Sequence, residues 1–120
     1  MGKIISYKDL IVWQRSIQLV KEIYLLTKLF PKDETFGLIS QMKRAVVSIP
    51  SNIAEGFGRR SIKEHNQFCL ISYGSALELE TQIIIAIELG FISEKEAEKA
   101  NSLLNEVIRM LNIMTLPSRS

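Results

Sequence analysis

Apolar side chains recur along this chain at steps of three and four residues, in four separate stretches. That spacing places them on one face of an α-helix and is typical of helices that bury one side. The pattern predicts an all-α protein without strands, with helices near residues 9–29, 36–57, 61–89 and 93–115. Joined by short turns, four such helices pack most simply as an antiparallel up-down-up-down four-helix bundle. We expect one domain over residues 1–120, with an ordered core at about 6–116.

Local signals mark the ends of these stretches. A serine followed three residues later by an acidic residue can cap a helix N-terminus, and three pairs have this spacing: Ser6 with Asp9, Ser61 with Glu64, and Ser93 with Glu96. Proline and glycine end helices. The four predicted C-terminal signals are Pro31, the pair Gly56 and Gly58, Gly90, and Pro117.

The apolar stripes predict which residues face the core. These are Leu10, Trp13, Ile17, Val20 and Tyr24 in the first helix, Leu38, Met42, Ala45, Ile49 and Ile53 in the second, and Ala97, Ala100, Leu104, Val107, Leu111 and Met114 in the fourth. Further apolar residues fall outside a single stripe: Ile11, Leu19, Leu25, Leu26, Ile84, Ile85 and Ile87. This surplus predicts a second buried surface and hence self-association. The alternative is a scatter of exposed apolar residues, which monomers tolerate.

The second helix combines a proline with a polar stripe. Pro50 crowds the carbonyl of Val46, which predicts a kink, and nearby serine hydroxyls can satisfy the freed carbonyls. The stripe comprises Gln41, Arg44, Ser48, Asn52 and Glu55, and Ser75, Glu78 and Gln82 have matching spacing on an antiparallel third helix. We predict that these eight residues form a structural polar network that fixes the helix register. The alternative is that Asn52 and Glu55 line a functional site.

A glycine interrupts the third helix. Gly74 costs this helix about 1 kcal/mol relative to alanine. Close contact between helices usually offsets such a cost, so we expect Gly74 and Ser75 to face a neighbouring backbone.

Charge is distributed unevenly although the chain carries only +2 overall. Residues 1–63 hold 11 Lys+Arg against 5 Asp+Glu, whereas residues 64–120 hold 4 against 8. The basic candidates for nucleic-acid binding are Lys43, Arg59, Arg60 and Lys63, with Arg44 beside them, and the last three of the four cluster after the glycines. The alternatives are an ordinary solvated loop, and pairing of oppositely charged helices within the fold or between subunits.

Composition limits the remaining functions. With 47% apolar and 23% charged residues, the chain resembles an ordinary soluble protein, and no apolar run approaches membrane-spanning length. Cys69 is the single cysteine, which fits a reducing compartment, and we expect a cytoplasmic protein without a membrane partner. No zinc-type cluster, phosphate loop or Ser-His-Asp set is present. His65 and Cys69 lack a third orienting group, and Glu78, Glu80 and Glu88 lack the Glu-x-x-His pairs of di-iron bundles. We therefore predict no enzyme, no metal and no cofactor.

Several motifs together resemble a known family over about residues 6–92. They are Asp9-Leu10 with Val12-Trp13, Gly37-Leu38 with Gln41 and Arg44, Ser48-Ile49-Pro50 with Asn52 to Gly56, and the run from Gly74 to Thr81. They are similar to the bacterial four-helix-bundle family whose founding members are encoded by intervening sequences within 23S ribosomal RNA genes. That family has no established biochemical activity.

The resemblance implies an up-down bundle that assembles into a ring-like homopentamer. A related fold is the accessory protein of diversity-generating retroelements, a basic pentamer that partners a reverse transcriptase and binds nucleic acid. Where family members often carry a basic residue in the third helix, this chain has Tyr73. Two hypotheses follow. The first is an oligomeric accessory protein that binds RNA, or a nucleic-acid-processing protein, through a basic rim. The second is a structural or protein-interaction homo-oligomer without nucleic-acid affinity.

Overall fold

The computed structural model describes residues 4–119, and within that range it contains helices and no strand. Four α-helices, α1 (Ile11–Thr27), α2 (Leu38–Phe57), α3 (Ile62–Glu88) and α4 (Glu98–Arg119), are accompanied by two short 3-10 helices, η1 (Tyr7–Asp9) and η2 (Lys32–Glu34). The prediction of an all-α protein with four helices is confirmed.

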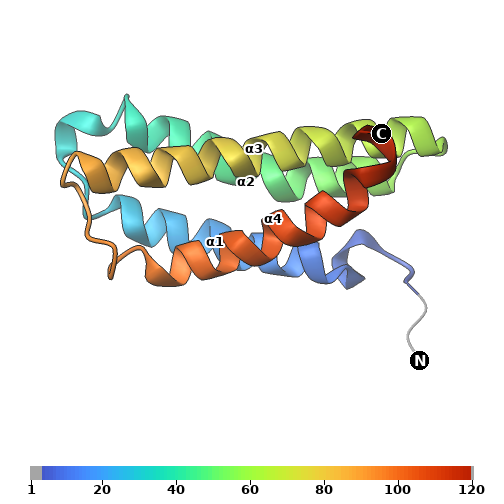
Figure 1. Ribbon diagram of the computed structural model, residues 1–120, viewed down its shortest axis with the longest axis horizontal. Coiled ribbons are helices and arrows are strands. Elements are labelled where there is room, and N and C mark those ends of the chain that lie inside the picture. The colour runs from blue at the N-terminus through green and yellow to red at the C-terminus, as the bar shows by residue number, and fades with distance from the viewer. Residues whose placement is uncertain (1–3, 120) are drawn as a thin grey trace.

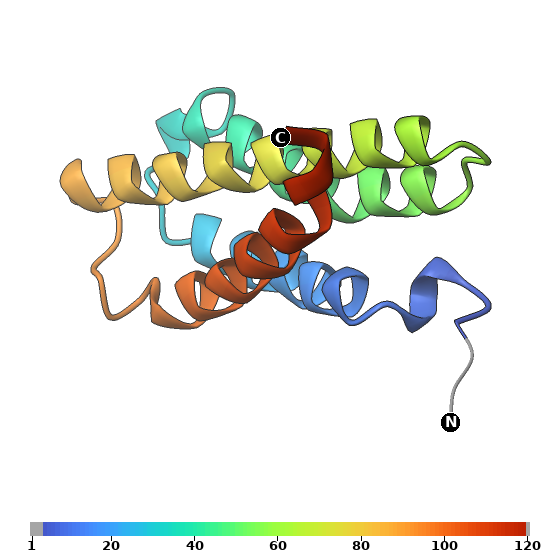
Figure 2. The same ribbon diagram turned by 45° about the vertical axis from the view of Figure 1, so that its right-hand side comes forward.

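The helices pack in a cycle. Close backbone approaches join α1 to α2, α2 to α3, α3 to α4 and α4 to α1, whereas α1 and α3 lie on a diagonal and have no Cα atoms within 8 Å of each other among the described residues. In Figure 1 successive α-helices run along the long axis in alternating directions, so α1 and α3 run the same way. Figure 2 shows the same order from a second direction.

The start of α1 differs from the prediction. Ser6 and Asp9 form their capping box, but it caps the 3-10 helix η1: the Ser6 hydroxyl accepts from the Lys8 N–H, and Asp9 accepts from the Ser6 N–H. Leu10 is then extended, with φ −75° and ψ 127°, and α1 begins at Ile11. The spacing identified the cap correctly, but it could not tell a single turn from a long helix.

The two ends of α4 also differ from expectation. Ser93 and Glu96 exchange both hydrogen bonds of a capping box, at 2.9 and 3.0 Å, yet regular helix begins only at Glu98. The helix continues to Arg119, past the end predicted at Pro117. Pro117 lies in the last turn, so the hydrogen bond that its missing N–H removes is close to the end of the helix.

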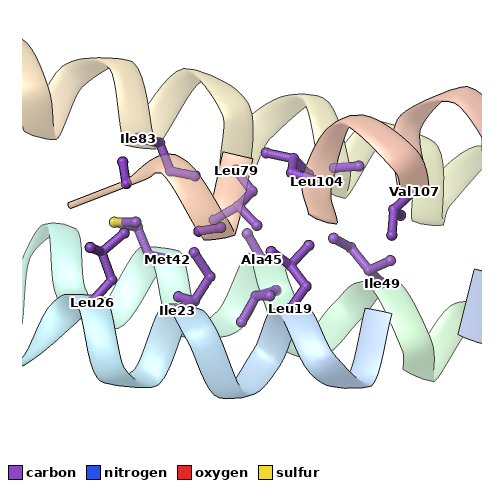
Figure 3. Packing of buried hydrophobic residues seen from close by; sticks show 14 of the residues in the cluster. Leu19, Ile23, Leu26, Met42, Ala45, Ile49, Leu79, Ile83, Leu104 and Val107 are labelled. Carbon is purple, nitrogen blue, oxygen red and sulfur yellow. The ribbon is translucent and has the colours of Figure 1, made fainter. Parts of the chain in front are cut away.

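The core lies between the four helices, where labelled side chains from each helix point toward one another (Figure 3). The stripes predicted for α2 and α4 are confirmed, with Met114 packed at the edge. The stripe predicted for α1 is right only in part: Leu10, Trp13 and Val20 are partly buried and pack against the core, but the helix is rotated so that other residues are fully buried. Its buried residues are Val12, Ser16, Leu19, Ile23, Leu26 and Thr27. The expected stripe from Leu10 to Tyr24 is half-buried or exposed.

Pro50 is buried inside a continuous α2. The three carbonyls that follow Val46 each accept a side-chain hydrogen bond: Val47 from Ser51, Ser48 from Asn52, and Ile49 from Ser72, all at 2.8 Å. Because proline disturbs the carbonyls of the preceding turn, these extra donors stabilise the helix where it is weakest. The kink at Pro50 stays a prediction.

The glycines have roles other than those expected. Gly74 lies on the exposed side of α3, and a Cβ added there would meet nothing within 4 Å, so the predicted backbone contact is wrong. The close approach is instead at Gly56, where a Cβ would lie 3.0 Å from Phe68 Cβ. Neither Gly56 nor Gly58 adopts a left-handed cap; among the described residues only Gly90 has a positive φ, at 77°.

Candidate functional site

A line of polar side chains joins α2 to α3. The hydroxyls of Ser48 and Ser75 are 2.9 Å apart, and Asn52 Nδ2 donates to both the carbonyl and the hydroxyl of Ser48 at 2.8 Å. The buried Ser72 hydroxyl donates to the Ile49 carbonyl one turn away. These bonds tie the two helices in one register, since a shift by one residue would leave buried polar groups unpaired.

Other members of the predicted network lie apart from this line. Gln41, Arg44 and Glu78 are exposed around a shallow hollow between α2 and α3, and Arg44 forms no ion pair with any described residue. Gln82 Nε2 donates to Glu78 at 3.3 Å, while its Oε1 is buried without a partner in the described part of the chain. The eight residues therefore form separate pieces rather than one connected network.

The end of α2 is held against the start of α3. His65 Nδ1 lies 3.0 Å from the Gly56 carbonyl, and its Nε2 lies 3.6 Å from the sulfur of buried Cys69. Burial raises the pKa of the Cys69 thiol above its ordinary value. A thiol that resists ionisation is a poor nucleophile, and the hydrogen bond from this pair to Gly56 joins the end of α2 to the start of α3. The four-residue spacing of His65 and Cys69 predicts that they share a helix face, but it does not predict the contact of His65 with Gly56.

The basic candidates do not form one surface. Arg59 is engaged, because its guanidinium pairs with Glu55 at 2.9 Å and lies over the Phe68 ring. Lys43 lies over the ring of Tyr24 on the α1 side, about 24 Å along α2 from Arg59 at 1.5 Å per residue. Arg60 and Lys63 are exposed beside the α2–α3 turn and form no ion pair among the described residues.

The side of α3 that faces away from the bundle is largely apolar. Ile71, Ile84 and Ile85 are 50%, 55% and 41% exposed, and Leu77 is 38% exposed. We define the outer face of α3 as its exposed residues from Ile71 onward: Ile71, Gly74, Leu77, Glu78, Thr81, Ile84, Ile85 and Glu88. The outer sides of α2 and α4 are mainly polar or charged. Large apolar side chains are therefore left uncovered mainly on α3 and, at Ile11, Tyr24 and Leu25, on α1.

Sequence reasoning found only part of this outer face. Of the residues assigned to a second surface, Leu19 and Leu26 are core and Ile87 packs against it, whereas Ile84 and Ile85 are exposed. By length and composition α3 is the one helix among the described residues apolar enough to cross a membrane. This is weak support for a membrane protein, since the core helix of a soluble protein passes the same test.

The described residues hold no group of three or more His, Cys, Asp or Glu placed to bind a metal ion. What the fold presents is an all-α, four-helix protein with a helix-joining polar line, a small basic end and an apolar outer helix face. Its sequence matches the 23S rRNA-intervening sequence protein family over residues 8–113. The chain therefore belongs to that family.

A solved structure has the same fold. It is a protein of unknown function from the S23 ribosomal protein family of Bacteroides thetaiotaomicron, with 22% sequence identity and a TM-score of 0.81. The similarity covers 88% of this chain and 99% of that one. Among curated proteins none matches this chain. The relation to the retroelement accessory protein stays a prediction.

Proposed function

We propose that this protein is a non-enzymatic cytoplasmic homo-oligomer that works by binding further copies of itself. The observation that carries the proposal is the outer face of α3. The bundle covers one side of α3, and the uncovered side exposes four large apolar side chains: Ile71, Leu77, Ile84 and Ile85. Exposed apolar area of this kind on a soluble protein marks an interaction surface.

Two small residues support this interpretation. Gly74 weakens α3 by about 1 kcal/mol relative to alanine, and nothing within the chain offsets that cost because its surroundings are open. The Thr81 hydroxyl donates to the Leu77 carbonyl of its own helix at 3.0 Å. That bond satisfies the hydroxyl locally, so Thr81 can be covered by an apolar partner without leaving a polar group unpaired.

Light scattering coupled to size exclusion tests the proposal over a range of concentrations. We expect a species larger than the 13.7 kDa chain at micromolar concentration, and family resemblance predicts five copies. Changing Leu77 to Glu should return the protein to a monomer, while the matched change of half-exposed Val47 on α2 to Glu should not. A wild-type protein that stays at 13.7 kDa up to about 100 μM would refute self-association. Its dissociation constant would then exceed about 100 μM, which corresponds to a binding free energy of less than about 6 kcal/mol.

Nucleic-acid binding is a second candidate function, and Arg60 and Lys63 favour it. Both are exposed beside the same turn, and an oligomer would repeat this pair once per copy. Cations that neutralise phosphates release counterions, so affinity for RNA should fall as salt rises. Contacts to the backbone alone would give little sequence preference.

A salt titration of binding to structured RNA tests this second function. The double change of Arg60 and Lys63 to Ala should weaken binding and flatten the salt dependence, whereas Arg59 to Ala should matter less because Glu55 already neutralises Arg59. Lys95 to Ala, an exposed lysine before α4, is the matched control. If the wild-type protein does not bind at about 50 mM salt, where phosphate contacts are strong, the protein-interaction function stands alone.

A further inference from the structure

The outer faces of α1 and α3 correspond to each other position by position. A shift of 60 residues aligns buried residues of α1 with buried residues of α3: Leu19 with Leu79, Ile23 with Ile83, and Leu26 with Ala86. Both helices therefore turn the same helical positions toward the core. As a result, the same shift also aligns the residues that point away from it.

The aligned outer positions are apolar on both helices. Four large apolar residues in α1 and just after it are exposed, and each has an exposed apolar counterpart on or just after α3: Ile11 with Ile71, Tyr24 with Ile84, Leu25 with Ile85, and Leu29 with Leu89. These positions are exposed because α1 and α3 turn the same helical positions toward the core. It does not explain why they are apolar.

Charges on the two faces are of opposite sign. The outer face of α3 carries Glu78 and Glu88, whereas the exposed side of α1 carries Lys21, and exposed Lys28 follows its last residue. None of these four takes part in an ion pair among the described residues. The 60-residue shift places Lys28 beside Glu88, so one register matches both the apolar and the charged positions.

We propose that the outer face of α3 in one copy packs side by side, in parallel, on the outer face of α1 in the next copy. This rests on the proposed self-association and names the surface that α3 meets. Because α1 and α3 run the same way and lie on a diagonal of the bundle, every copy presents both faces on opposite sides. Such a head-to-tail contact repeats from copy to copy, and it closes into a ring or stays open according to the rotation between copies.

Pairing of α3 with α3 across a two-fold axis fits less well. The charged residues of this face, Glu78 and Glu88, are both acidic, so pairing the face with a second copy of itself brings only like charges together. Like charges at neighbouring positions are destabilising. Against α1, the acidic face instead meets lysines and glutamines.

Two complementary variants test the pairing. Leu25→Glu damages the α1 face and leaves α3 intact, while Ile85→Glu damages the α3 face and leaves α1 intact. A head-to-tail contact predicts that each variant alone is a monomer of 13.7 kDa, and that mixing them restores one intact contact and gives a heterodimer of twice that mass. Ile113→Glu, on the exposed side of α4, is the matched control and should leave the wild-type mass unchanged. Circular dichroism of each variant checks that the bundle remains folded.

The outcomes separate this inference from the function on which it rests. If Leu25→Glu associates like the wild type while Ile85→Glu does not, α3 meets a surface other than α1, and the pairing is overturned while self-association stands. If neither variant changes the mass, the contact is elsewhere and the pairing is again overturned. A monomeric wild type would refute the self-association itself.

Discussion

The same substitution, glycine to alanine, should have opposite effects at two positions of this fold. Gly56 and Gly74 both lie within helices, so alanine gains about 1 kcal/mol of helix propensity at either. At Gly74 an added Cβ meets nothing within 4 Å. Gly74→Ala should therefore stabilise the protein by about 0.5–1 kcal/mol.

At Gly56 the added methyl group collides with α3. Its position is 3.0 Å from Phe68 Cβ and 3.2 Å from the His65 carbonyl oxygen, whereas carbon atoms in good contact are about 3.5–4.0 Å apart. Phe68 Cβ and the backbone of His65 cannot move independently of α3, so the two helices must separate. Overpacking of this kind costs about 1–3 kcal/mol, which outweighs the propensity gain. We expect Gly56→Ala to be less stable than Gly74→Ala by about 1–3 kcal/mol.

Urea unfolding monitored by circular dichroism measures this difference. The comparison belongs at protein concentrations where the midpoint no longer changes with concentration, since association adds apparent stability. A Gly56→Ala variant as stable as Gly74→Ala would show that α2 and α3 do not approach as closely as described. A destabilised Gly74→Ala would show that the outer face of α3 is already filled in the free protein.

Three further predictions concern single side chains. Ser72→Ala removes the buried hydroxyl that donates to the Ile49 carbonyl, and chemical denaturation should show a loss of about 1 kcal/mol; an unchanged midpoint would contradict the role of this bond. Because burial raises the pKa of the Cys69 thiol, the folded state keeps that proton to higher pH than the unfolded chain. Stability should therefore decline as pH rises past about 9. Cys69→Ala should show less of this decline, and equal pH profiles for the two proteins would refute the role of the thiol. Arg59→Ala breaks an exposed pair with Glu55 and should cost less than about 1 kcal/mol in the same assay; a larger loss would mean that the contact with Phe68 dominates.

Capping residues, helix breakers and apolar periodicity predicted the helices well. The error on α1 shows that these local signals do not determine which side of a helix faces the core. Two candidate stripes run along this helix, and the one with Trp13 and Tyr24 has the larger side chains. The buried stripe contains Ser16 and Thr27, whose hydroxyls donate to carbonyls of their own helix at 2.7 and 3.2 Å. Such bonds make polar side chains inexpensive to bury. Periodicity alone favoured the stripe with Trp13 and Tyr24 because it does not reveal these hydrogen bonds.

The candidate site was less predictable than the fold. Spacing put Ser48 and Ser75 in one network across α2 and α3, because an antiparallel register follows from short connections between helices. It did not identify the contact between these two hydroxyls. It could not show that Arg59 lies over Phe68 or that Lys43 lies over Tyr24, since those contacts depend on side-chain direction and on how each helix is rotated. The predicted contact between Gly74 and a neighbouring backbone failed for a related reason. A glycine within a helix can indicate that another backbone packs closely there, but it does not indicate whether that backbone belongs to the same chain.

The junction between Gly56 and His65 also bears on the order in which the protein folds. Helices α2 and α3 are adjacent in sequence, joined by only residues 58–61, and their polar line is made of contacts at most 27 residues apart. Closing such a short loop loses little chain entropy, whereas α1 must find α4 across most of the chain. We therefore expect the α2–α3 hairpin to form first and to serve as the template on which α1 and α4 dock. The hairpin would then be complete before α4 docks on it, and the outer face of α3 would be exposed from that moment.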